Sequence, residues 1–159
     1  DTARSRGLGD VYKRQVLGGE MSGHIFINHD WYGFDDAVYT AAILAKIISD
    51  TDLPASSIIG QFQKTFATPE INLNVDDVKK FKMVQKFKEQ MQFPDAEFNT
   101  IDGVRVSIGS SWGLIRASNT SPKLVLRFEA ETEKDLKRIK DLFELNLKNI
   151  FPELNLDFN

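Results

Sequence analysis

Hydrophobic residues recur at strand and helix spacings along most of the chain, and these spacings predict its elements. Residues 25–27 form a short apolar run suited to a buried strand. Residues 34–49 follow with apolar side chains on nearly every face of a helix, which we therefore expect to be largely buried. A second, short helix is predicted to begin at Pro54 and to run through Phe62, because proline is tolerated in a first helical turn.

Two neighbouring carboxylates, Asp35 and Asp36, fall in the first turn of the helix predicted over residues 34–49. Negative charge at a helix N-terminus complements the helix dipole. We therefore assign both side chains to this capping role rather than to metal binding.

Strand and helix spacings resume after Pro69, which interrupts any helix. Ile71, Leu73 and Val75 alternate with polar residues, as in a strand with one buried face. Residues 76–91 then have helical spacing. The apolar positions of this helix, expected to face the core while the intervening lysines point to solvent, are Val78, Phe81, Val84, Phe87 and Met91.

Three further strands are predicted. FNTI (residues 98–101) and VRVSI (residues 104–108) flank Asp102 and Gly103. This pair suits a two-residue type I′ hairpin, because both central positions of that turn need a positive φ. LVLRFEA (residues 124–130) alternates apolar and polar residues, as in a sheet covered on one face.

The last predicted helix begins at a capping-box-like pair, Thr132 and Asp135. Its apolar stripe consists of Leu136, Ile139, Phe143, Leu147 and Ile150. The pattern predicts an α+β fold class: a C-terminal domain of about four antiparallel strands with two helices on one face, preceded by the end of an α/β domain. We place the boundary near residue 66, so that residues 16–66 form the first part and residues 67–159 the second.

The composition is that of a soluble globular protein, with 42% hydrophobic and 27% charged residues. The net charge of -3 is small and no stripe of Lys and Arg is interleaved with aromatics, which argues against nucleic acid and membrane surfaces as partners. The absence of cysteine excludes disulfides and thiolate metal sites and fits the cytoplasm. No apolar run approaches the roughly 18 residues that span a bilayer, and the N-terminus lacks an apolar signal core, so we expect neither an anchor nor export.

Residues 1–15 follow none of these patterns. The codons GAT GTG TAT AAG AGA CAG spell DVYKRQ (residues 10–15) and resemble the transposon-end adapter of sequencing libraries, whose flank fits the preceding SRGLG. We interpret residues 1–15 as an artefactual translated segment and exclude them from fold reasoning; a flexible basic arm is the alternative. On this interpretation the gene begins upstream, and the chain is a C-terminal fragment.

GGEMSGH (residues 18–24) lacks the apolar pattern of a helix or strand. It places Glu20, Ser22 and His24 at alternating positions, which in an extended segment lie on the same side. Its glycines let the backbone approach a ligand, and a carboxylate with a hydroxyl can accept and donate hydrogen bonds to a sugar. The alternatives are a tight turn whose histidine is satisfied by backbone, and a Ser22/His24 nucleophile pair, which is disfavoured because no third group is evident to orient the base.

RASNTSP (residues 116–122) crowds polar side chains directly before a strand. Arg116 offers a planar fork that matches phosphate oxygens, and the hydroxyl and amide side chains with loop N–H groups can complete the shell of a dianion. Phosphate is the expected ligand. The alternative is an ordinary turn rich in Asn and Ser with a surface arginine.

GGEMSGH, followed by GFDDA, TPEIN, DGVRV, WGLIRASNTSP and LVLRFEAET, resembles in order and spacing the phosphomannomutase/phosphoglucomutase branch of the α-D-phosphohexomutases across nearly all of residues 16–158. The resemblance implies that GEMSGH is the sugar-binding loop of a third domain and RASNT the phosphate-binding loop of a fourth, which is similar in fold to one repeat of the TATA-binding protein. It further implies a sugar-binding role for Glu20 and Ser22 and a proton-transfer role for His24 at the active site. The residues that it implies to hold phosphate are Arg116, Ser118, Asn119 and Thr120.

The same resemblance implies a parent enzyme that reversibly interconverts hexose 1- and 6-phosphates of mannose or glucose, with magnesium and with glucose 1,6-bisphosphate as activator and intermediate. The family's phosphoserine loop and aspartate-rich magnesium loop have no counterpart in this sequence. Because phosphoryl transfer needs an in-line donor and a cation, we expect the chain to bind hexose phosphates without turnover, to hold no metal, and to depend on missing N-terminal domains. A non-catalytic phosphosugar-binding or interaction module is the alternative.

Overall fold

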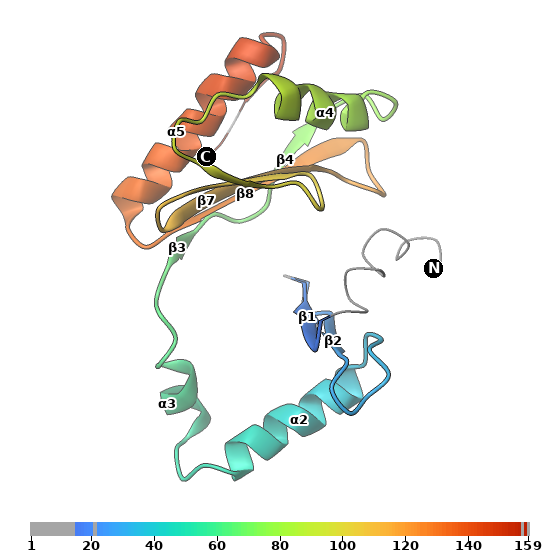
Figure 1. Cartoon of the computed structure of the whole chain (residues 1–159), viewed down its shortest axis with the longest axis vertical. Coiled ribbons are helices and arrows are strands. Elements are labelled where there is room, and N and C mark those ends of the chain that lie inside the picture. Colours follow the sequence, from blue (N-terminus) through green and yellow to red (C-terminus); the bar gives the residue numbers. More distant parts are fainter. Residues whose placement is uncertain (1–14, 21, 157, 159) are drawn as a thin grey trace. The chain divides into compact units, whose positions relative to one another are not determined.

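The computed structural model describes residues 15–20, 22–156 and 158, and the chain divides into two units, Asp1–Gln63 and Lys64–Asn159. Of the segment interpreted as foreign, residues 1–15, all but Gln15 lies outside the described residues. The described residues of the first unit form an antiparallel two-stranded ribbon and two helices (Figure 1). Its elements are β1 (Leu17–Gly19), β2 (Ile25–Ile27), α2 (Ala37–Ser49) and α3 (Ala55–Ile59).

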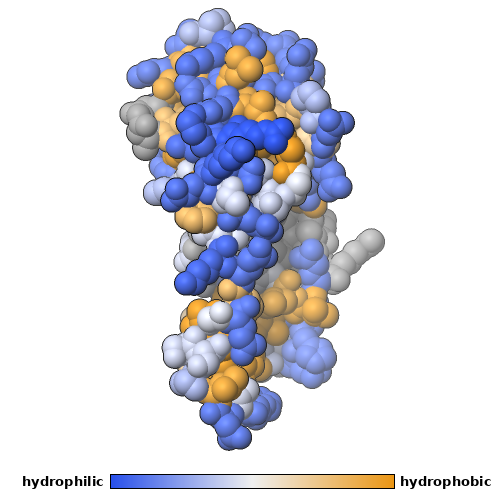
Figure 2. Space-filling view, turned by 90° about the vertical axis from the view of Figure 1, so that its left-hand side faces the viewer, coloured by the Kyte–Doolittle hydropathy of each residue, from blue (hydrophilic) through white to orange (hydrophobic). Residues whose placement is uncertain are grey.

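Helix α2 is exposed in this unit, so the prediction of a largely buried helix is wrong for this chain. None of its 13 residues, all of them described, is buried, and Val38 is 82% exposed. The ribbon of β1 and β2 supplies too little apolar surface to cover a helix that is apolar on most faces. Figure 2 accordingly shows hydrophobic residues, in orange, at the surface of this unit.

The two carboxylates before α2 differ in role. Asp36 is the N-cap, and its Oδ1 accepts a hydrogen bond from the Tyr39 amide at 2.9 Å. Asp35 lies outside the helix, where its backbone forms an isolated β-bridge with Phe26. The capping prediction is therefore right for Asp36 and wrong for Asp35.

The second unit is an antiparallel sheet with α4 and α5 on one face (Figure 1). The strand order is β3-β8-β7-β6-β5. Strand β4 also pairs with β8, along a different stretch of it from β3. Its elements are β3 (Phe66–Ala67), β4 (Ile71–Asn74), α4 (Lys80–Gln90), β5 (Glu97–Asn99), β6 (Val104–Ile108), β7 (Ser111–Ala117), β8 (Lys123–Ala130) and α5 (Glu133–Ile150). The predicted fold class is confirmed, and β3 and β7 are strands that the sequence pattern did not indicate.

Strand β7 was not predicted because three of its four buried positions carry small residues, Ser111, Gly113 and Ala117, and only Ile115 is large and apolar. A Cβ at Gly113 would lie 2.5 Å from Phe143 Cε2 and 2.8 Å from Phe128 Cδ1. Glycine is therefore required where these rings cross the sheet, and the alternation of large apolar residues is lost.

The core lies between the sheet and the two helices. Phe87, Phe128 and Phe143 are fully buried, and their ring centroids lie 5.7 Å (Phe87–Phe143) and 5.1 Å (Phe128–Phe143) apart. The predicted stripe and N-cap of α5 are confirmed: four of the five predicted positions are buried, and Thr132 accepts a hydrogen bond from the Asp135 amide at 3.1 Å.

Helix α4 begins later than predicted, at Lys80. The Asp76 carboxylate accepts a hydrogen bond from the Val78 amide at 2.8 Å, which holds the preceding residues in a turn. Val78 is 83% exposed and Phe81 56% exposed, so the prediction that they face the core is wrong. The predicted stripe is correct only from Val84 onward.

The type I′ hairpin predicted at Asp102 and Gly103 is also wrong. Asn99 and Arg105 are the last paired residues, and of the loop residues, all described, Gly103 alone has a positive φ (80°). The two-residue loop is instead Gly109 and Ser110 between β6 and β7, with a φ of 57° at the glycine, as a type II′ turn needs at its first position.

No helix within residues 15–20, 22–156 and 158 is long and apolar enough to cross a membrane.

Candidate functional site

The GEMSGH segment is a hairpin loop between β1 and β2. Gly19 pairs with Ile25, the Glu20 amide donates to the His24 carbonyl at 2.9 Å, and Gly23 has a φ of 87°. The prediction that an extended backbone aligns the three polar side chains is therefore wrong, because the chain reverses here.

The loop nevertheless brings the two predicted sugar-binding side chains together. The Ser22 hydroxyl donates to Glu20 Oε2 at 3.2 Å, and both residues are exposed. A carboxylate and a hydroxyl thus converge at an accessible loop tip, where they can accept and donate hydrogen bonds to a polyol.

His24 contacts a residue that the sequence pattern assigned elsewhere. Its Nδ1 lies 2.5 Å from Asp35 Oδ2, so the histidine is satisfied by a carboxylate and not by backbone. The group that the sequence lacked for orienting a base is therefore present. Among the described contacts, however, the Ser22 hydroxyl bonds to Glu20 and not to His24, so no nucleophile pair is formed.

An aromatic cluster holds the segment between β2 and α2. Trp31 and Tyr39 stack with centroids 4.2 Å apart and planes 6° apart, and Trp31 Nε1 donates to Asp36 Oδ2 at 3.3 Å. The cluster ties the segment to the first turn of α2. It thereby fixes Asp35, which precedes the N-cap.

Arg116, the first residue of the predicted phosphate loop, lies near the end of β7 on the face without helices. Its side chain is 33% exposed. Its Nη2 lies 4.0 Å from Glu70 Oε1, and its Nη1 lies 3.9 Å from Asp102 Oδ2. These separations exceed hydrogen-bonding distance, so both carboxylates keep the guanidinium in place without occupying its donors.

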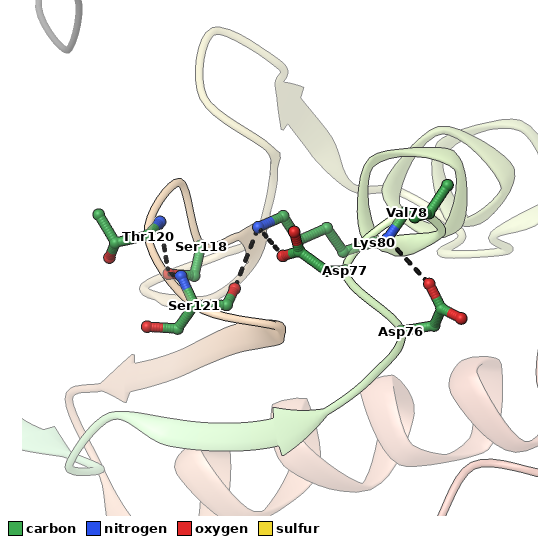
Figure 3. Close-up of polar contacts among 7 residues, drawn as sticks. All are labelled: Asp76, Asp77, Val78, Lys80, Ser118, Thr120 and Ser121. Carbon is green, nitrogen blue, oxygen red and sulfur yellow. Dashed lines mark hydrogen bonds and ion pairs between the residues drawn. The ribbon is translucent and has the colours of Figure 1, made fainter.

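Ser118 shapes the rest of the loop. Its buried hydroxyl accepts hydrogen bonds from the amides of Thr120 (3.3 Å) and Ser121 (3.2 Å), as Figure 3 shows. Asn119 and Thr120 are exposed. The loop therefore presents two polar residues to solvent, on a turn that is fixed by the Ser118 hydroxyl.

Lys80 anchors this loop, although the sequence pattern placed its side chain in solvent. The residue is 4% exposed, and its Nζ donates to Asp77 Oδ1 at 2.6 Å and to the Ser121 carbonyl at 3.1 Å (Figure 3). The paired carboxylate and the carbonyl offset the cost of burying the ammonium group. The prediction that every intervening lysine points to solvent is wrong here for that reason.

Two domain models of one protein family match this chain. Phosphoglucomutase/phosphomannomutase, alpha/beta/alpha domain III, matches residues 10–66, and the C-terminal domain of the same family matches residues 70–145. The chain belongs to the phosphoglucomutase/phosphomannomutase family. The predicted sugar-binding segment thus falls in domain III of the family and the predicted phosphate-binding segment in its C-terminal domain.

Individual members of the family are similar over most of this chain. A phosphomannomutase/phosphoglucomutase of Pseudomonas putida is 49% identical over 143 residues, which are 90% of this chain and 31% of that protein. A phosphoglucomutase of Neisseria gonorrhoeae is 40% identical over 81% of this chain and 28% of its own length. The chain thus spans about a third of the length of these relatives.

A solved structure agrees. A phosphoglucomutase/phosphomannomutase family protein of Burkholderia thailandensis is similar with a TM-score of 0.80 and 40% identity, over 98% of this chain and 32% of that chain.

The boundary between the two units of this chain lies after Gln63 in its structure, whereas the two family models leave residues 67–69 between them. The boundary near residue 66 stays a prediction.

A pocket of about 200 Å³ adjoins the phosphate loop in the phosphoglucomutase/phosphomannomutase C-terminal domain. Phe81, Lys88, Asp102 and Asn119 are among its lining residues. Phe81 is exposed because it forms part of this wall and not of the core. The pocket therefore combines an aromatic surface with an ammonium, a carboxylate and an amide.

Within the part of the chain that the structure describes, no group of three or more His, Cys, Asp or Glu side chains could hold a metal ion. The family resemblance implies magnesium, and the described residues do not fit it.

Proposed function

We propose that this chain is the sugar- and phosphate-binding part of a hexose-phosphate mutase, an isomerase that interconverts hexose 1- and 6-phosphates through a bisphosphorylated sugar. One observation carries the proposal: two loops with complementary ligand chemistry, one for hydroxyls and one for a dianion, lie in the two matched domains of a single family. The names of the relatives point to mannose and glucose phosphates as substrates.

Arg116 supplies the charge for phosphate binding. Its donors are not committed to Glu70 or Asp102, and Asn119 and Thr120 add neutral donors from the exposed part of the loop. Ser118 accepts hydrogen bonds from the amides of Thr120 and Ser121 and so sets the shape of the loop, and its O–H proton remains available as a further donor to a phosphate oxygen.

Glu20 and Ser22 are proposed to bind sugar hydroxyls, and His24 to exchange a proton with one of them. We place the phosphoserine donor and the magnesium ligands in upstream domains of the parent protein, and glucose 1,6-bisphosphate as its intermediate and activator. The parent is placed in the cytoplasm, as the absence of cysteine favours.

A non-catalytic module that binds phosphosugars with the same loops is the second candidate. Sequencing the intact locus separates the two. A serine-histidine phosphoacceptor loop and a DGD-type metal loop upstream support the mutase, whereas an independent start codon near Val16 supports the module.

Phosphate binding is tested by NMR titration of the full chain with phosphate and with glucose 1-phosphate. A charge-assisted pair contributes about 1.5–3 kcal/mol and a neutral hydrogen bond about 0.5–1.5 kcal/mol, before the ligand and the loop are ordered. Since 1 mM corresponds to about -4.1 kcal/mol, we expect a Kd on the order of millimolar or weaker.

Arg116→Ala is expected to abolish the phosphate-induced shifts, and the exposed Arg138 on α5 provides the matched control. Glu20→Ala should change little, because the sugar loop lies in the other unit. Shifts centred away from residues 116–120, or an equal loss in Arg116→Ala and Arg138→Ala, would refute this assignment of the loop.

A further inference from the structure

We infer that Asp35 is a positioning residue for His24: it fixes the tautomer of the imidazole so that Nε2 faces the ligand as the proton-accepting atom. This inference rests on the proposed function, in which His24 exchanges a proton with a sugar hydroxyl. It adds to that function a residue outside the GEMSGH loop.

The chemistry of the two groups determines the tautomer. An ionised carboxylate only accepts hydrogen bonds, so the 2.5 Å contact between His24 Nδ1 and Asp35 Oδ2 requires the proton on Nδ1. In a neutral imidazole the other nitrogen is then unprotonated. Nε2 is left with the lone pair, and a proton that it accepts gives an imidazolium whose charge Asp35 balances.

The carboxylate of Asp35 is held from several directions. Its Oδ1 accepts a hydrogen bond from the Ile25 amide at 3.3 Å, and its backbone is bridged to Phe26 in β2. The next residue, Asp36, caps α2 and accepts from Trp31. The strand and the helix therefore determine together where the carboxylate meets the imidazole.

The first unit contains a second histidine–aspartate pair that lacks this support. His29 Nε2 lies 3.5 Å from Asp30 Oδ2, the two residues are adjacent in sequence, and their side chains are 77% and 86% exposed. No other hydrogen bond of the Asp30 side chain is found among the described residues. His29 therefore serves as an internal control for an unpositioned imidazole.

Stability alone does not explain the His24 pair. Its side chains are 56% and 39% exposed, and ion pairs of such exposure contribute little to folding. The ring remains accessible, and the Ser22 hydroxyl is directed to Glu20. An accessible imidazole with one nitrogen fixed by a carboxylate is the arrangement expected of a general base.

The test measures the tautomer in the full chain labelled with ¹⁵N-histidine, in alkaline buffer, from the ring nitrogen shifts. We expect His24 in the Nδ1–H form and His29 without that preference. Asp35→Ala should convert the His24 spectrum to that of His29, Asp35→Asn should retain part of the Nδ1–H signature through its amide oxygen, and Asp30→Ala should leave His24 unchanged.

The inference is overturned if wild-type His24 is in the Nε2–H form, or if Asp35→Ala leaves its shifts unchanged. Amide spectra of the second unit serve as the folding control. Because this measurement needs no substrate, its outcome is independent of the phosphate titration, so a failure of the proposed mutase function can be distinguished from a failure of the positioning role.

Activity of the intact parent protein supplies a second measurement. Asp35→Ala should lower kcat about tenfold or more with little change in KM, because proton transfer and not ligand binding is affected. Asp35→Asn should recover part of the loss. A change confined to KM would contradict the inference.

Discussion

The ammonium group of Lys80 donates a hydrogen bond to the carbonyl of Ser121 at 3.1 Å, across 41 positions of sequence. The first residue of α4 and the last turn of the phosphate loop are thereby joined through a buried cation. Ser118 fixes the same turn from the other side. The shape of the phosphate loop thus depends on a residue outside its own segment.

Lys80→Met should destabilise the second unit by about 1–3 kcal/mol, because it removes the donor to a partly buried carbonyl. It should also weaken phosphate binding, because the loop loses its anchor. Urea unfolding and the phosphate titration measure the two effects. Lys82→Met, at an exposed position of α4, is the control and should stay within about 0.5 kcal/mol of wild type. Equal behaviour of the two variants would contradict the anchoring role.

Gly113→Ala should destabilise the second unit by about 1–3 kcal/mol or more, because the added methyl group meets Phe143 and Phe128 at 2.5 and 2.8 Å. Thermal unfolding, monitored by the spectroscopic signal of the buried aromatic residues, gives the change in the free energy of unfolding. Gly19→Ala in β1 is the control, since its Cβ meets no atom within 4 Å. A Gly113→Ala variant as stable as Gly19→Ala would show that the rings can move aside.

The chain alone should show no mutase activity on glucose 1-phosphate or mannose 1-phosphate, even with magnesium and glucose 1,6-bisphosphate. The sequence holds no phosphoacceptor loop, so the in-line donor is missing. A coupled assay on a clean preparation measures this. Turnover that is lost in Ser22→Ala would overturn the prediction and restore Ser22 as a nucleophile.

Deleting residues 1–15 should leave the melting temperature unchanged. These residues carry few apolar side chains and no periodic face that could offset the entropy of ordering them. Differential scanning calorimetry of the full and shortened chains makes the comparison. A decrease of several degrees would argue that the segment is native.

The predictions that succeeded rest on local patterns. The stripe of α5 and its cap can be read within one helix and the residue before it, because the spacing of Ile139, Phe143 and Leu147 selects one face of a helix. The two segments proposed to bind ligands were singled out from side-chain chemistry in short stretches, and their ligands stay predictions. The fold class followed from the same periodicities.

Several of the failures share a physical cause, since they depend on a contact from another segment. Lys80 is buried because the Ser121 carbonyl, together with the nearby Asp77, accepts hydrogen bonds from its ammonium group. Asp35 lies outside the first turn of α2, where it contacts His24 and the Ile25 amide. Helical spacing also overestimated burial in α2, where the apolar faces exceed the surface available to cover them. Spacing along a chain identifies an apolar face but not its partner.

The position of β8 in the sheet has a consequence for how the second unit is synthesised. This strand, the last of the unit, pairs with β3, β4 and β7, and residues as far apart as Phe66 and Ala130 are partners. On a ribosome, the earlier strands β3 and β4 therefore emerge without their pairing partner. They must wait, exposed to chaperones and to other nascent chains, until β8 has left the exit tunnel. Translation pauses that occur before β8 has left the tunnel should consequently lower the yield of folded protein.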